Sequence, residues 1–87
     1  MAHHPQARKR ARQNPKRRVR NRLHKTAMRT AIRRLRKALE AGDKTEAAQL
    51  LGPAVSRINR TASRGAIHRN KAARTVSRLA RAVASLE

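Results

Sequence analysis

Basic side chains are the chemically active groups that this sequence repeats at regular spacing. One set recurs every three or four positions, which places it along one side of a helix: Arg18, Arg22, Lys25, Arg29, Arg33 and Arg36. A second set near the C-terminus has the same spacing: Lys71, Arg74, Arg78 and Arg81. We call these the first and second cationic rows. Guanidinium and ammonium groups bind phosphates, and an arginine can hold one phosphate through two parallel hydrogen bonds.

The overall charge explains why these rows are not ordinary solvated faces. The chain has 87 residues, of which 24 are Lys or Arg and only 4 are Asp or Glu, so its formal net charge is +20. Acidic residues are too few to neutralise the rows by pairing within a helix, and aligned like charges repel one another. A phosphate backbone reverses this cost, because binding releases its counterions. The sequence therefore predicts a polyanionic partner.

Composition excludes several other functions. There is no Cys, Phe, Tyr or Trp, so neither thiolate chemistry nor stacking of bases on aromatic rings is available. We expect no enzyme, cofactor or small-molecule substrate, because no nucleophile lies near a candidate base in any known pattern. His3 and His4 have no third metal ligand at suitable spacing. No apolar run reaches 18 residues and no secretory signal is present, so we expect no membrane association.

Helix signals divide the chain into three segments. Asn14-Pro15 is a typical helix start and Gly42 a typical end. Asp43 then reads as the N-cap of a second helix, with Glu46 reaching back in a capping box, and Arg64-Gly65 ends that helix. The predicted helices cover about 15–41, 44–63 and 68–86. Gly52-Pro53 should kink or split the second helix, and the continuous periodicity favours a kink.

Apolar residues at helical spacing predict how these helices pack. The first helix carries Met28, Ile32, Leu35 and Leu39; the second has apolar residues at 47, 50, 51, 54, 55, 58 and 62; the third carries Ala72, Val76, Leu79, Ala80, Val83 and Leu86. The fold class is therefore all-α, an antiparallel three-helix bundle with a long first helix. Val19 and Leu23 lie off the first stripe, so the first half of this helix should overhang the bundle. The second helix carries few cations and should face away from the polyanion.

Residues 1–14 form a basic N-terminal arm with no large apolar residue after Met1. Such a segment cannot bury apolar surface, so we expect it to be disordered until phosphates neutralise it. Its cations are Arg8, Lys9, Arg10 and Arg12.

A longer motif adds a family resemblance. The run from Arg64 to Arg74, which reads RGAIHRNKAAR, followed by Ser77-Arg78-Leu79, closely resembles the signature of the bacterial small-subunit ribosomal protein twenty family. The match extends in order over nearly the whole chain. This resemblance implies a three-helix bundle that binds 16S ribosomal RNA directly and early in subunit assembly, with few protein contacts. It also implies a cytoplasmic, ribosome-bound protein, bacterial or organellar.

The resemblance also implies which residues contact RNA. They are Arg8, Lys9, Arg10 and Arg12 of the arm; Arg17, Arg18, Arg22, Lys25 and Arg29 of the first helix; and His68, Arg69, Asn70, Lys71, Arg74 and Arg78 of the signature. The spacing argument adds Arg33, Arg36 and Arg81. For His68 and Asn70 the alternative is local capping of the third helix by Asn70 beside an exposed imidazole.

Two other functions are compatible with the composition. A histone-like, DNA-compacting protein would have a similar charge, although no DNA-reading motif is present. A membrane-active cationic peptide is disfavoured, because the apolar stripes are rich in Ala and lack Trp or Phe anchors.

Overall fold

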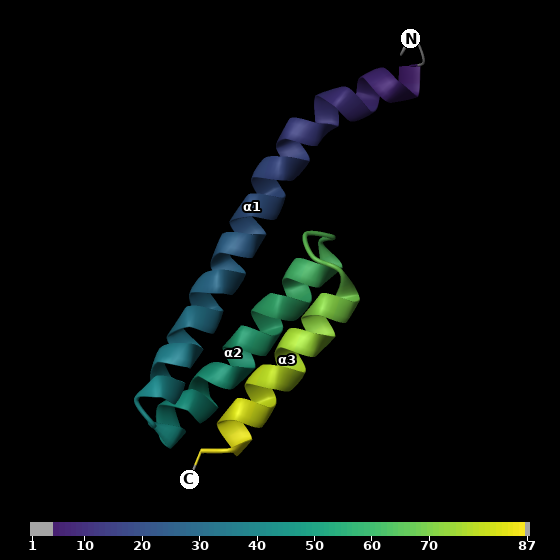
Figure 1. Ribbon diagram of the computed structural model, residues 1–87. Helices are drawn as coiled ribbons and strands as arrows, with labels where there is room; N and C mark the ends of the chain where they lie inside the picture. Colours follow the sequence, from purple (N-terminus) through teal and green to yellow (C-terminus); the bar gives the residue numbers. More distant parts are fainter. Residues whose placement is uncertain (1–4, 87) are drawn as a thin grey trace.

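The chain folds into three α-helices. The computed structural model describes residues 5–86, with side chains from residue 15 onward, and within this part it contains no strand. Helix α1 spans Pro5–Glu40, α2 spans Lys44–Ser63 and α3 spans Arg69–Ala84 (Figure 1). The predicted all-α class is confirmed, and the predicted bounds of the second helix are reproduced.

The predicted start of the first helix at Asn14-Pro15 is wrong. Helix α1 begins at Pro5 and contains Pro15 in its interior. Proline keeps helical φ, although it removes one hydrogen bond and its ring crowds the carbonyl four residues earlier. The Ala, Arg, Lys and Gln residues on both sides favour helix. Helical propensity therefore carries α1 past the expected boundary. The disorder of residues 1–14 without RNA stays a prediction.

A glycine with a left-handed backbone conformation lies in each of the two connections between the helices. Gly42 has a φ of +69° and Gly65 a φ of +77°. After α1, the backbone N–H of Asp43 donates to the carbonyl of Ala38 at 3.0 Å, and the N–H of Gly42 donates to the carbonyl of Leu39 at 3.1 Å. The same pattern follows α2, where the N–H of Ala66 donates to the carbonyl of Thr61 at 3.1 Å. Both ends are therefore Schellman motifs, which satisfy the last carbonyls of each helix.

At the start of α2, one of the two hydrogen bonds of the predicted capping box is formed. Asp43 is the N-cap, and its carboxylate accepts the backbone N–H of Glu46 at 3.0 Å. The expected return bond from Glu46 to the amide of Asp43 is absent, since that amide already donates to Ala38. Further on, α2 continues through Gly52-Pro53 as one helix, so the proline does not split it.

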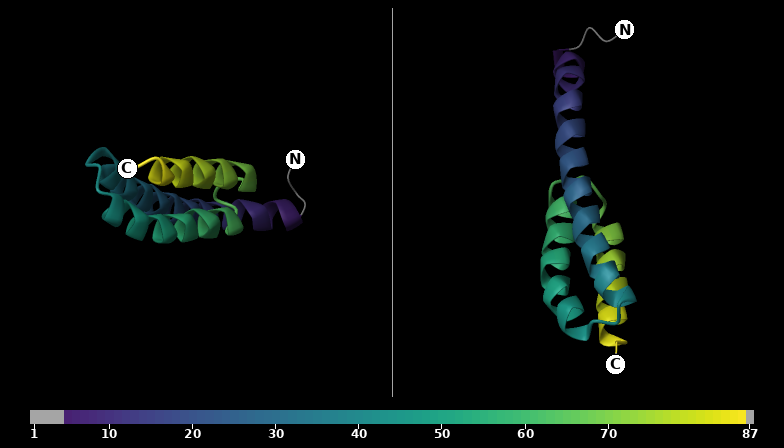
Figure 2. Two further views of the ribbon diagram at one scale, coloured as in Figure 1. Left: turned by 90° about the horizontal axis from the view of Figure 1, so that it is seen from below. Right: turned by 90° about the vertical axis from the view of Figure 1, so that its left-hand side faces the viewer.

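Helix α2 is the central element of the bundle. It packs along both α1 and α3, whereas α1 and α3 make few direct contacts. Each helix runs antiparallel to the next, so α1 and α3 run in the same direction (Figure 2), and in the view of Figure 1 α2 lies between them. At about 1.5 Å per residue, the 36 residues of α1 span roughly 54 Å against about 30 Å for α2. The N-terminal half of α1 consequently projects beyond the bundle, as the positions of Val19 and Leu23 predicted; these side chains are 58% and 64% exposed.

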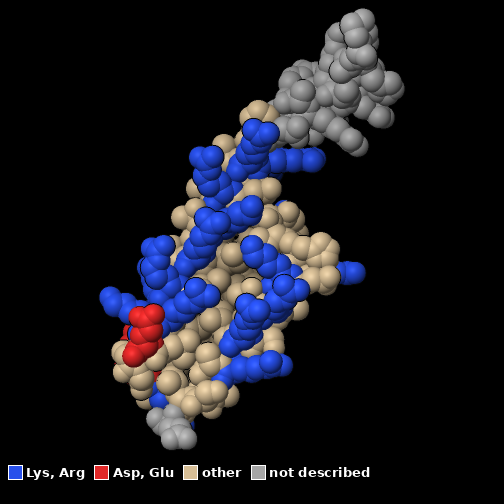
Figure 3. Space-filling view, viewed as in Figure 1, with Lys and Arg blue, Asp and Glu red and all other residues tan. Residues whose placement is uncertain are grey.

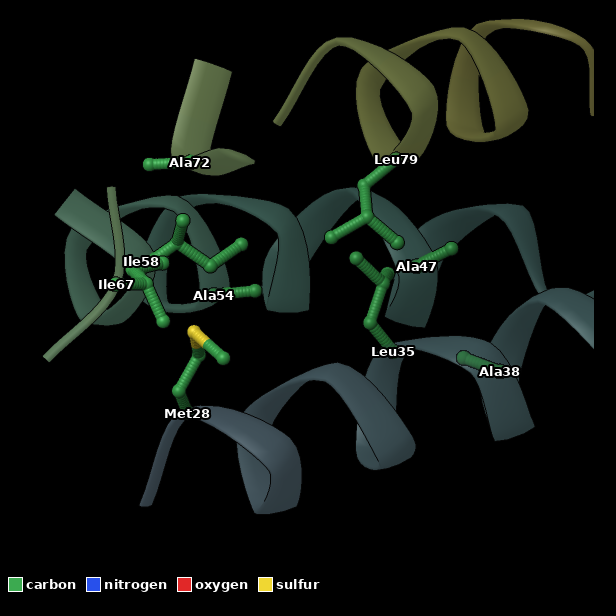
Figure 4. Packing of buried hydrophobic residues seen from close by; sticks show 9 residues of the cluster. All are labelled: Met28, Leu35, Ala38, Ala47, Ala54, Ile58, Ile67, Ala72 and Leu79. Atoms are coloured by element: carbon green, nitrogen blue, oxygen red, sulfur yellow. The ribbon is translucent and has the colours of Figure 1, made fainter. Parts of the chain in front are cut away.

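The core is small and rich in alanine. Leu35 and Ile58 are its largest fully buried apolar side chains. Figure 4 shows the buried cluster between the three helices: Met28, Leu35, Ala38, Ala47, Ala54, Ile58, Ile67, Ala72 and Leu79. Alanines let the helix backbones approach closely but bury little apolar area each. Most of the remaining predicted stripe, including Ile32, Leu50 and Val83, is half-buried against this cluster.

Thr61 is a buried polar residue that the apolar pattern did not predict. Its hydroxyl is fully buried and lies 2.8 Å from the carbonyl oxygen of Arg57 in its own helix. The same hydroxyl lies 3.3 Å from the carbonyl oxygen of His24 in α1. A single hydroxyl thus links α2 to α1 at the point where α1 leaves the bundle.

No helix in the described range is both long and apolar enough to span a bilayer.

The left-handed turn at Gly65 gives a stability prediction. A Cβ at this position would meet no atom within 4 Å, so the effect of Gly65→Ala is backbone strain alone. We expect the free energy of unfolding to fall by about 1–2 kcal/mol, measured by thermal unfolding in sulfate buffer, which screens the cations. Gly65→Asn should lose less, since Asn tolerates positive φ. Equal losses in both variants would contradict this explanation.

Candidate nucleic-acid interface

The first cationic row lies on the exposed side of α1. Arg18, Arg22, Arg29, Arg33 and Arg36 are exposed and Lys25 is half-buried. A shallow hollow on the projecting half of the helix gathers the N-terminal part of the row and is lined by Arg18, Asn21, Arg22, Lys25, Thr26 and Arg29. Arg29 also borders the groove described next. The row therefore forms one continuous surface along α1.

A groove of about 670 Å³ separates α1 from α3. It exists because the two helices pack on α2 and hardly on each other. Arg29, Arg33 and Arg36 line it from α1 and Lys71 lines it from α3, while Met28 and Ile32 supply apolar surface between them. The α1–α3 groove thus has cations on both sides. Figure 3 shows Lys and Arg side chains over α1 and over α3, with other residues between them.

The second cationic row is exposed on α3. Lys71, Arg74, Arg78 and Arg81 all reach solvent, on the side of the helix that faces away from buried Ala72 and Leu79. Because α3 runs parallel to α1, the two rows run in the same direction. The structure therefore brings together two cationic surfaces that are far apart in the sequence.

His68, and not Asn70, caps α3. The ring Nδ1 of His68 accepts the backbone N–H of Asn70 at 3.0 Å, and His68 has the extended backbone of an N-cap. An imidazole that accepts through Nδ1 carries its proton on Nε2, so an N–H remains available to an external acceptor. His68, Arg69 and Asn70 are all exposed. The alternative that Asn70 caps α3 is therefore wrong, because Asn70 supplies the N–H and His68 the acceptor. Contacts of these side chains with RNA stay a prediction.

The described acidic residues lie at one end of the molecule. Glu40 is the last residue of α1, and Asp43 and Glu46 begin α2. Glu40 borders the end of the α1–α3 groove beside Arg36 and Lys37. Most of the length of both rows is therefore far from any described acid, so their mutual repulsion is not offset within this part of the chain.

Sequence reasoning missed several residues around these surfaces. Lys37 lines the α1–α3 groove. Arg20, Asn21, His24 and Arg64 line a separate pocket that also includes Arg17, so Arg17 lies on a different side of α1 from the first row. The spacing of the apolar stripe could have identified the α1 members, because residues 17, 21 and 24 continue it toward the N-terminus.

Some predictions fall outside the described part of the chain. They are the RNA contacts predicted for the side chains of Arg8, Lys9, Arg10 and Arg12, and the absence of a metal site at His3 and His4.

Comparisons with known proteins agree with the resemblance of the signature. The family model described as "Ribosomal protein S20" matches residues 2–84. The chain is 50% identical to the small ribosomal subunit protein bS20 of Syntrophobacter fumaroxidans, over 99% of this chain and 100% of that protein. It is 48% identical to the protein of the same name from Desulfotalea psychrophila, over 99% of this chain and 97% of that protein. It is 49% identical to the one from Burkholderia cenocepacia, over 100% of this chain and 97% of that protein.

The cap of α3 gives a second prediction. His68→Ala removes the acceptor for the amide of Asn70, and we expect a loss of about 1 kcal/mol in the free energy of unfolding, as for other N-caps. His68→Asn restores a side-chain acceptor and should recover most of it. Thermal unfolding monitored by helical circular dichroism measures both, and an Asn variant no better than the Ala variant would contradict the capping role.

Proposed function

Because this chain belongs to the ribosomal protein S20 family, we propose that it binds 16S ribosomal RNA directly and stabilises the packing of RNA helices during assembly of the small subunit. Its place is then on the ribosome in the cytoplasm. The proposed contacts are with RNA backbone, with few protein contacts and no small-molecule substrate.

The observation that carries this proposal is the α1–α3 groove, which has Arg29, Arg33 and Arg36 of the first cationic row on one side and Lys71 of the second row on the other. Arg33 of α1 and Lys71 of α3 both line the groove, although they are distant in the sequence. Helix α2 fixes the position of one row relative to the other, because it packs on both α1 and α3. A rigid pair of rows can contact phosphates on neighbouring RNA strands at once.

The physical role of the rows is to neutralise repulsion between closely packed phosphates. Each phosphate contact releases condensed counterions, so affinity is strongly salt-dependent. Without aromatic residues, recognition depends on the shape of the folded RNA and the positions of its phosphates. Duplex DNA of equal charge presents a different arrangement of phosphates and should bind less well.

A binding titration tests the proposal. At about 0.15 M salt, the protein should bind structured 16S RNA much more tightly than duplex DNA with the same number of phosphates. The logarithm of the binding constant should fall steeply with the logarithm of salt concentration, by about 0.9 for each phosphate neutralised. Equal affinity for the two nucleic acids would overturn the proposal in favour of a DNA-compacting protein.

Two neighbouring arginines provide a matched pair for this titration. Arg33 lines the α1–α3 groove, whereas Arg34 lies on another side of α1 beside Ala38 and Glu46. Both are exposed, so either change to Gln removes one charge without disturbing the core. Arg33→Gln should weaken RNA binding about tenfold, as expected for a charged hydrogen bond, and Arg34→Gln by about twofold or less.

The N-terminal arm gives a separate prediction. Residues 5–14 are helical in the structure, but residues 2–14 contain no large apolar side chain that could pack. We propose that this part of α1 is stable only when RNA phosphates neutralise its charge. Amide hydrogen exchange should therefore be fast before residue 15 in the free protein and slow in the complex with RNA. Strong protection of this segment without RNA would contradict the prediction.

A further inference from the structure

We propose that Thr61 is a positioning residue for RNA binding, whose buried hydroxyl fixes the direction in which the projecting half of α1 leaves the bundle. This hydroxyl lies 3.3 Å from the carbonyl oxygen of His24 in α1 and 2.8 Å from that of Arg57 in α2. The side chain is fully buried, so it would act through α1 and not by touching RNA. The inference rests on the proposed function, since it takes RNA as the partner.

Thr61 occupies a position of α2 at which burial alone would favour an apolar residue. It follows buried Ala54 and Ile58 at helical spacing, so it lies on the side of α2 that faces the core. Burying a hydroxyl costs free energy unless the group is hydrogen-bonded, and a valine of nearly the same shape would avoid that cost. What distinguishes Thr61 from an apolar residue is therefore the bond that its hydroxyl makes.

The contact with His24 differs from the other side-chain hydrogen bonds of residues 15–86. Within this range the others join positions at most four apart, whereas Thr61 and His24 are 37 positions apart. The bond to Arg57 is the ordinary one that a helical threonine makes to its preceding turn, and Thr30 makes the same bond to Thr26 at 2.9 Å. The contact with His24 is thus the one that acts between helices.

This contact lies where the apolar packing of α1 ends. Met28, one helical turn after His24, is the first residue of α1 in the buried cluster. Before His24, Val19 and Leu23 are exposed, and a pocket of about 500 Å³ lies between α1 and the α2–α3 connection. Beyond this level α1 continues without a neighbouring helix (Figure 1). Met28 and the hydroxyl of Thr61 therefore provide the buried contacts nearest to the projecting half.

A small change of direction at His24 is amplified along the helix. Arg18, at the N-terminal end of the first cationic row, lies about 9 Å further along the axis at a rise of about 1.5 Å per residue. A tilt of about 10° would move it by roughly 1.5 Å over this length, whereas hydrogen bonds to oxygen tolerate only a few tenths of an ångström. A satisfied buried polar contact specifies one packing arrangement. With this contact in place, the projecting row and the α1–α3 groove keep one relative position toward folded RNA.

The first test changes the hydroxyl and the methyl group of Thr61 separately. Thr61→Val removes the hydroxyl and keeps the packing, so the melting temperature should stay the same or rise, while binding to structured 16S RNA should weaken about fivefold, as for one lost hydrogen bond. Thr61→Ser keeps the hydroxyl and loses a buried methyl group, so the melting temperature should fall while RNA affinity stays within about twofold. If Thr61 only stabilised the fold, RNA affinity would follow the melting temperature in both variants, and the inference would be wrong.

Thr30→Val is the matched control. It removes a helical threonine hydroxyl that bonds within α1, to the carbonyl of Thr26, and it should change RNA affinity by about twofold or less. A loss as large as that of Thr61→Val would mean that removing any such hydroxyl suffices, and it would overturn the inference.

Spin-label distances test the direction of α1 without RNA. The chain has no cysteine, so Val19→Cys on the projecting half and Ala48→Cys on α2 provide two unique labelling positions, and both residues are exposed. In sulfate buffer the distribution of distances between the labels should be narrow with Thr61 or Thr61→Ser and broader with Thr61→Val. An equally narrow distribution in Thr61→Val would show that apolar packing alone sets the direction, and the inference would fail.

Failure of the inference and failure of the proposed function give different results. If Thr61→Val binds RNA as tightly as the unchanged protein while Arg33→Gln still weakens binding, the inference is wrong and the proposed function stands. If Arg33→Gln has no effect either and RNA binds no better than duplex DNA, the proposed function fails and the inference fails with it.

Discussion

Repulsion among unpaired cations is the constraint on which this structure depends. A formal charge of +20 on 87 residues cannot be neutralised by the few acids present, and the described acids are gathered where α1 meets α2. The apolar cluster that opposes this repulsion consists largely of alanines and a few aliphatic side chains. The fold therefore gains stability from any partner that supplies dense negative charge. The RNA backbone of the proposed partner would supply such charge, and its binding would then stabilise the bundle.

Helix α2 determines where the cations of the other two helices lie. It packs on both neighbours, and α1 and α3 are left with few contacts between them, so the two cationic rows stay apart on either side of a groove. Ala47 and Ala54 allow close approach of the helices, and the hydroxyl of Thr61 links α2 to the carbonyl of His24. The helix with the fewest cations thus positions the cations of the other two. Membership of the ribosomal protein S20 family gives this geometry its biological setting.

The projecting half of α1 carries basic side chains beyond the end of the bundle. Val19 and Leu23 remain exposed there, and the structure offers no packing role for them. Within the bundle, one side of α1 faces the core. In the projecting half, the same side carries Arg17, Asn21 and His24, which lie beside Arg64. The projecting half of α1 therefore presents basic residues on more than one of its sides.

Local signals in the sequence determined much of this protein. Helical spacing identified the cationic rows and most of the core, and Gly42, Asp43 and Gly65 marked helix ends that need positive φ or a side-chain cap. Tertiary structure decided what these signals could not. The helix passes through Pro15, with strong helix formers on both sides, despite the lost hydrogen bond and the crowding by the proline ring. The pocket that brings Arg17 and Arg20 together with Arg64, and the hydrogen bond from Thr61 to His24, arise only when α1 lies against the end of α2. Spacing along one helix reports which residues share a side, but the partner that each side meets depends on packing between segments distant in the chain.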